Sequence, residues 1–78
     1  MSKDVTLDNF STLYGQFYDI DVTAHENGNN DLRDTAYDYA SETDTIMSNY
    51  NDMTQEELNA KYLELWGKYV ECLAELNS

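Results

Sequence analysis

The helical character of the chain is clearest between Thr54 and Leu76, where it reads TQEELNAKYLELWGKYVECLAEL. Thr54 and Glu57 have the types and spacing of a capping box, in which two side chains satisfy two backbone N–H groups at the start of a helix. A long periodic segment follows without a turn signal. We therefore predict a helix over residues 55–76.

Apolar residues of this segment fall on two neighbouring stripes, at alternating spacings of three and four residues. The first stripe contains Leu58, Tyr62, Leu65, Tyr69, Cys72 and Leu76, and the second contains Leu63, Trp66, Val70 and Leu73. We interpret the two stripes as one broad buried face. Cys72, the lone cysteine, is expected to act there as a small buried hydrophobe. Two ion pairs at i, i+4 spacing are also predicted, Glu57–Lys61 and Glu64–Lys68.

The chain contains no proline, and its turn-forming residues are concentrated at Glu26–Asn30 and Asn49–Asp52. These turns divide it into three segments, which we predict as helices at about 5–24, 31–50 and 55–76. Asn30 or Asp31 is the expected N-cap of the second helix. Three helices joined by short turns favour an all-α fold, a small antiparallel three-helix bundle that forms one domain over residues 1–78.

Each of the first two segments has an apolar face at helical spacing. The residues expected to point inward are Leu7, Phe10, Leu13, Tyr14, Phe17, Ile20 and Ala24 in the first, and Leu32, Ala36, Tyr39, Thr43, Ile46, Met47 and Tyr50 in the second. Gly15 and Gly67 lie inside predicted helices, where glycine costs about 1 kcal/mol relative to alanine. We expect a neighbouring helix to approach closely at both glycines.

The composition excludes several classes of protein. The 78 residues include 16 acids and 4 bases, which gives a formal charge of −12, and 13% of the residues are aromatic. Disordered acidic tails have few aromatics, so we expect this chain to fold. Direct binding to nucleic acid or to an anionic membrane depends on Lys and Arg and is not expected. No apolar run in residues 1–25 suits a signal peptide or a membrane span, which favours a cytoplasmic location.

The distribution of the acids carries the functional inference. Seven acids and no base occur from Asp34 to Ala60. Four acids share one helical stripe at ~5 to 6 Å between neighbours, and these are Asp31, Asp34, Asp38 and Glu42. Like charges at this spacing weaken a helix, so folding alone does not explain them. A row of regularly spaced anions is also what a nucleic-acid backbone presents.

This comparison predicts a protein that imitates DNA or RNA, with carboxylates in place of phosphates as acceptors for Arg and Lys. The acids expected to bind the partner are Asp4, Asp8, Asp19, Asp21, Asp31, Asp34, Asp38, Glu42 and Asp44. Tyr37 lies between Asp34 and Asp38, and Tyr18 lies near the edge of the first apolar face. If exposed, these rings could stack on arginine planes or fill sites that normally take bases. The alternative is that they form half-buried rims of the core.

In size, helical content, acidity and tyrosine richness, the whole chain resembles the small acidic proteins that phages encode against host defences. These are the anti-CRISPR proteins and the Ocr-type antirestriction proteins. The resemblance rests on overall properties and on no shared motif. It implies an inhibitor that acts as a DNA mimic in the cationic groove of a basic nucleic-acid-binding protein. The implied partner is a CRISPR effector, a restriction enzyme or a nucleoid protein in the cytoplasm of the host cell.

Two other functions stay open. An acidic adaptor or immunity-type protein would neutralise a basic partner without imitating nucleic acid. A soluble housekeeping domain would owe its acidity to its environment. The core of so short a chain is small, which also leaves open a homodimer contact through the aromatic face of the third helix.

Catalysis is not expected. The chain has no glycine-rich phosphate loop, no CxxC pair and no nucleophile elbow. His25 is the only histidine, and together with Asp21 and Glu26 it forms an imaginable metal-binding group. We interpret His25 as a solvated turn residue and expect no cofactor or metal.

Overall fold

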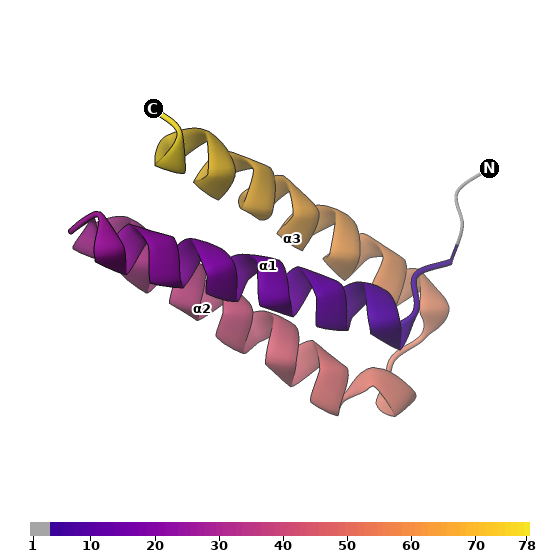
Figure 1. Ribbon diagram of the computed structural model, residues 1–78. Helices are drawn as coiled ribbons and strands as arrows, with labels where there is room; N and C mark the ends of the chain where they lie inside the picture. The colour runs from indigo at the N-terminus through magenta and orange to yellow at the C-terminus, as the bar shows by residue number, and fades with distance from the viewer. Residues whose placement is uncertain (1–3) are drawn as a thin grey trace.

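The computed structural model describes residues 4–78, which form an all-α three-helix bundle (Figure 1). Helix α1 spans Leu7–Glu26, α2 spans Asn30–Ser48 and α3 spans Gln55–Leu76. A short 3-10 helix, η1, spans Tyr50–Asp52 and connects α2 to α3. Successive α-helices run in opposite directions (Figure 1). The predicted bundle is confirmed, and the helix boundaries differ from the prediction by two residues or fewer.

The helices begin at side-chain caps that the sequence supplies. At α3 the predicted capping box is present, because Thr54 Oγ1 accepts from Glu57 N at 3.1 Å and Glu57 Oε1 accepts from Thr54 N at 2.9 Å. Thr6 and Asn9 form the same arrangement at α1. At α2 the cap is Asn29, whose Oδ1 accepts from Leu32 N at 3.2 Å. The prediction of Asn30 or Asp31 as this cap was therefore wrong.

The turn between α1 and α2 depends on Gly28. Its φ of +75° lies in the left-handed region, which glycine adopts without a steric penalty. The N–H of Asn29 then donates to Ala24 O at 2.9 Å, closing the end of α1 in the manner of a Schellman motif. This turn reverses the chain tightly and brings α2 alongside α1 (Figure 1).

Helices α1 and α2 form the closest pair, and α3 packs on them through aromatic rings. Small side chains at Ala36 and Ala40 of α2 are fully or almost fully buried and let α1 approach. Rings of α3 meet α1 edge-on, with centroids 5.5 Å apart for Phe10 and Tyr62. The buried hydrophobic core comprises Phe10, Leu13, Phe17, Ile20, Ala24, Leu32, Ala36, Ala40, Ile46, Leu58, Leu65 and Cys72. The expectation that Cys72 is buried is confirmed.

Part of the apolar surface that the sequence assigns to the core is exposed. The second stripe of α3, Leu63, Trp66, Val70 and Leu73, is exposed over its whole length. The other helices cover only the side of α3 that contains Leu58, Leu65 and Cys72. The interpretation of one broad buried face was therefore wrong. Leu7 and Tyr14 of α1 are exposed for the same reason, since they lie beside the buried side and not on it.

The ion pairs and glycines of the helices also differ from expectation. Lys61 lies 3.5 Å from Glu64, and Lys68 lies 3.9 Å from Glu71, so both lysines pair with an acid that follows them. The predicted pairs are absent from residues 4–78, since Glu57 is already bound in the capping box. A Cβ atom added at either Gly15 or Gly67 would meet no atom within 4 Å, so the expected helix contact there is wrong within this chain. Across the same residues, no helix combines the length and apolarity needed to cross a membrane.

Candidate partner-binding surface

Helix α2 carries a row of exposed carboxylates on the side that faces away from the bundle. Its buried side contains Leu32, Ala36, Ala40, Thr43 and Ile46. The acids fall between these positions, and every member of the row is exposed, namely Asp31, Asp34, Asp38 and Glu42. We call these four residues the α2 acid row. A rigid helix therefore holds the row without the cost of ordering a flexible segment.

One member of the α2 acid row has a cation beside it. Arg33 Nη2 lies 3.4 Å from Asp34 Oδ1, and both side chains are substantially exposed. Arg33 Nη1 also lies 3.2 Å from His25 Nδ1. Because a guanidinium group only donates, Nδ1 of His25 is the acceptor in this contact. Exposed ion pairs are worth about 0 to 1 kcal/mol, so Arg33 is a weak competitor for any incoming cation.

The predicted acids of the N-terminal part do not all join one surface. Asp8 and Asp19 are exposed on α1, three helical turns apart. Asp21 is partly buried and lies on a different side of α1 from Asp19. Asp4 precedes α1 and accepts a hydrogen bond from Asn59 Nδ2 at 3.2 Å, which places it beside the start of α3. The structure therefore separates Asp4 and Asp21 from the pair Asp8 and Asp19.

A shallow groove of about 280 Å³ lies between α1 and α2, and three tyrosines line it. Its lining residues are Tyr14, Tyr18, Tyr37, Ala40, Ser41, Asp44 and Thr45. We call it the tyrosine groove. Tyr18 is 51% exposed and Tyr37 is 59% exposed, so about half of each residue is open to solvent while the rest lines the groove. Within residues 4–78, none of its three rings stacks on another ring, whereas Tyr39, Tyr62 and Tyr69 pack on core phenylalanines.

The sequence identified Tyr18, Tyr37 and Asp44 but missed Tyr14, because Tyr14 fitted the periodicity of the apolar face. The signal that could have found it is its spacing of four residues from Tyr18, which places both rings on one side of α1. Ser41 and Thr45 gave no signal, since small polar residues on a helix surface are ordinary. Their place in the groove follows from the antiparallel packing of α1 against α2.

The tyrosine groove offers the groups that recognise a guanidinium ion. Aromatic faces attract the cation, and the Asp44 carboxylate can accept its N–H groups. Small-molecule pockets usually enclose about 300 to 1,000 Å³, so this groove is better matched to one side chain of a partner than to a whole ligand. The acid row on the same helix would lie close to such a side chain.

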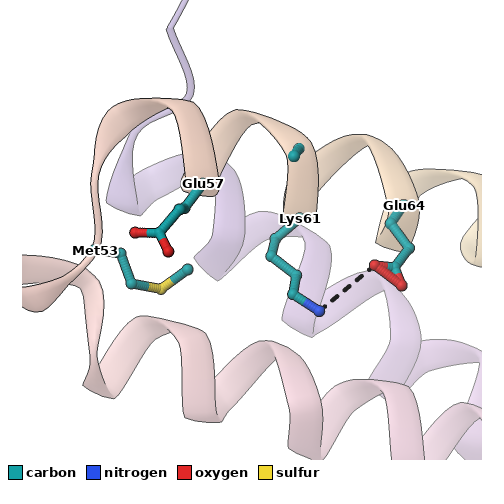
Figure 2. Close-up of a pocket in the computed structure, with 5 residues that line it drawn as sticks. Met53, Glu57, Lys61 and Glu64 are labelled. Carbon is teal, nitrogen blue, oxygen red and sulfur yellow. Dashed lines mark ion pairs between the residues drawn. The ribbon is translucent and has the colours of Figure 1, made fainter.

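A second groove, of about 240 Å³, lies along the N-terminal half of α3 (Figure 2). Its residues are Met53, Glu57, Ala60, Lys61 and Glu64. Figure 2 shows Lys61 paired with Glu64, and Glu57 is held by the N–H of Thr54. Both carboxylates therefore already have partners within the chain. The groove therefore offers a basic partner fewer free acceptors than the exposed acids of α2.

The described residues hold no group of three His, Cys, Asp or Glu side chains that could bind a metal ion. Burial, with Glu75 and Glu71 nearby, raises the pKa of the Cys72 thiol, which keeps the thiol protonated at neutral pH. No protein-family model matches the chain, and no curated protein or solved structure is significantly similar to it. The functional argument therefore rests on the residues of the chain itself.

Proposed function

We propose that the protein binds a basic nucleic-acid-binding protein in place of its nucleic acid, through α1 and α2, and thereby inhibits it. The observation that carries this proposal is the exposed α2 acid row beside a groove lined by three tyrosines and Asp44. Regularly spaced anions can pair with the cations that line the groove of a nucleic-acid-binding protein, and aromatic rings can occupy the sites where such a protein stacks on bases. We therefore propose a phage inhibitor whose target is a CRISPR effector or a restriction enzyme, since the groove that binds nucleic acid in such a target would suit this surface.

The charge density of the row favours imitation of one strand over imitation of a duplex. Asp31 and Glu42 are eleven residues apart, which is about 16 Å along a helix. Four charges over that length give about one per 5 Å, whereas one nucleic-acid strand has one per ~3.4 Å and a duplex one per ~1.7 Å. The charge density of the α2 acid row alone therefore approaches that of a single strand. Asp44 and the acids of α1 add charge on neighbouring surfaces.

Binding at this face requires little rearrangement. The acids lie on a helix that is already folded, and among residues 4–78 the only ion pair of the row is the weak contact between Arg33 and Asp34. A target arginine could enter the tyrosine groove and contact Asp44 while other cations meet the row. Association should be fast at low salt, because long-range attraction steers the encounter and is screened over ~8 Å at physiological ionic strength.

The proposal is tested with two double variants of the same charge change. Asp34→Lys with Asp38→Lys reverses two acids at i, i+4 spacing on α2, and Glu71→Lys with Glu75→Lys does the same on α3. An affinity pull-down from host lysate at low and high salt identifies the partner. We expect the α2 double variant to lose the partner while circular dichroism keeps its helical signal. The α3 variant should retain it; equal retention by both variants would remove α2 from the binding face.

An acidic adaptor is the second candidate, since the same surface would suit any strongly basic protein. An adaptor and a mimic should bind with the same sensitivity to salt, but they differ in whether they compete with nucleic acid for the partner. An adaptor leaves the nucleic-acid site of its partner free, so a ternary complex with nucleic acid forms. A mimic and a nucleic acid exclude each other.

A further inference from the structure

The outer side of α3 contrasts with the rest of the molecule because it carries no charge over 19 residues. Between Asn59 and Asn77 the exposed acids Glu64, Glu71 and Glu75 lie away from this side, and the exposed residues on it are Ala60, Leu63, Trp66, Gly67, Val70, Leu73 and Ala74. The charged residues of the same span lie on the opposite flank, where the lysines pair with neighbouring glutamates. Four of the exposed residues are large and apolar, and their exposed fractions run from 37% to 71%. We call these four, Leu63, Trp66, Val70 and Leu73, the α3 strip.

The α3 strip has the spacing of a helix–helix contact. Asn59, Leu63, Trp66, Val70, Leu73 and Asn77 follow one another at intervals of four, three, four, three and four residues. This alternation is the a and d pattern of a coiled coil. Ala60, Gly67 and Ala74 run beside it at intervals of seven. A Cβ added at Gly67 would meet nothing within 4 Å, so this side of the helix is open to the close approach of another backbone.

The same series is symmetric about residue 68, as an antiparallel contact between two copies of this helix requires. Read in an antiparallel pair of α3 helices, Leu63 of one copy faces Leu73 of the other, and Trp66 faces Val70. Asn59 faces Asn77 at each end of the series. A two-fold interface needs this kind of self-complementarity. If residue i of one copy contacts residue j of the other, then residue j of the first copy must also contact residue i of the second.

Charge also favours a second copy over a basic partner at this site. The strip offers no carboxylate to a basic protein, whose cations would instead find the exposed acids of α1 and α2. Two copies of net charge −12 repel each other, and an uncharged side is where they can approach with the least repulsion. We infer that the chain forms an antiparallel homodimer through the α3 strip, with Leu63–Leu73 and Trp66–Val70 layers across the two-fold axis.

The dimer should respond to salt in the opposite sense to the proposed inhibitor complex. Added salt screens the repulsion between two acidic copies and so strengthens the dimer, while it weakens attraction to a basic target. Sedimentation equilibrium at about 50 mM and about 500 mM NaCl measures this. We expect a mass approaching twice 9.0 kDa with tighter association at high salt. A chain that stays monomeric at both salt concentrations, up to millimolar protein, would overturn the inference.

Charge complementation tests the register. We expect Leu63→Glu alone or Leu73→Lys alone to weaken association about tenfold or more. Both substitutions in one chain should restore it, because the new carboxylate would face the new ammonium across the two-fold axis. If the double variant stays as weak as the single variants, the antiparallel register is wrong. Val22→Glu serves as the control, since Val22 is an exposed apolar residue on α1 whose exposed fraction, 42%, is close to the 37% of Leu73. The dimer of this variant should be unchanged. Loss of the dimer in this control would show an unspecific charge effect and overturn the assignment to α3.

Discussion

Helices α2 and α3 are similar in length and both present one side to the core, yet their outer sides are opposite in character. The outer side of α2 carries the acid row, while that of α3 is uncharged between Asn59 and Asn77. Within that span the charge on α3 is confined to one flank, where Lys61 pairs with Glu64 and Lys68 pairs with Glu71. Acidity in this chain is therefore a property of particular surfaces. A uniformly salt-adapted surface would place acids on the outer side of α3 as well.

The largest expected effect is loss of the fold, which would remove both surfaces together. Phe17 is fully buried, and the centroid of its ring lies 5.6 Å from that of Tyr39 and 5.9 Å from that of Tyr69. Phe17→Ala should lower the free energy of unfolding by about 3 to 5 kcal/mol, which is comparable to all that a core of this size supplies. Urea unfolding followed by circular dichroism measures the change. Tyr18→Ala, at the exposed neighbouring position, should change it by less than ~0.5 kcal/mol. Similar losses in both variants would contradict the assigned core.

A pair of aromatic substitutions separates the two surfaces. Tyr37→Ala should cost about 1 to 3 kcal/mol of target binding, because it removes a stacking ring from the tyrosine groove, and should leave the dimer unchanged. Trp66→Ala should weaken the dimer and leave target binding intact. Titration calorimetry with the captured target and sedimentation of each variant alone provide the two measurements. A variant that impairs both interactions equally would show that the surfaces are not independent.

The caps predict a smaller change in stability. Thr54→Ala removes the oxygen that accepts from Glu57 N at 3.1 Å and should cost about 1 kcal/mol of unfolding free energy. Thr6→Ala should cost a similar amount at α1, because Thr6 and Asn9 form an equivalent box. Thermal unfolding of both variants tests this. A fully stable Thr54→Ala protein would mean that the cap is frayed in solution.

The smallest effect concerns Cys72. At neutral pH the thiol is protonated in the unfolded chain, because its ordinary pKa lies above neutral, and also in the folded chain, where burial raises the pKa further. As the pH rises past the ordinary thiol pKa, the unfolded chain ionises first, so the folded state loses stability until its own raised pKa is passed. Alkylation by iodoacetamide should be slow in the native protein and should become fast in urea. Fast alkylation of the native protein would contradict burial of this side chain.

Some features of the fold could be predicted because they depend on local chemistry. Thr54 and Glu57 determine the start of α3, and the acids of α2 follow from spacing alone. The cap at Thr6 was missed because Asn9 occupies the place where Glu or Gln is usual in a capping box.

Other features depend on packing that periodicity does not encode. Apolar residues on α3 extend well beyond the side that two neighbouring helices can cover, so the sequence could not say that Leu63 and Val70 stay outside. The tyrosine groove likewise combines two helices, and neither helix predicts it alone. The contact between Asp34 and Arg33, adjacent in sequence, also depends on the rotamers that the side chains adopt.

The most direct test of the central claim is displacement of nucleic acid from the captured target. A fluorescent oligonucleotide is bound to the target, the acidic protein is added, and fluorescence anisotropy reports release. We predict that the wild-type chain releases the oligonucleotide in a concentration-dependent manner and that the Asp34→Lys, Asp38→Lys chain does not. A stable ternary complex of target, oligonucleotide and wild-type chain would contradict imitation of nucleic acid.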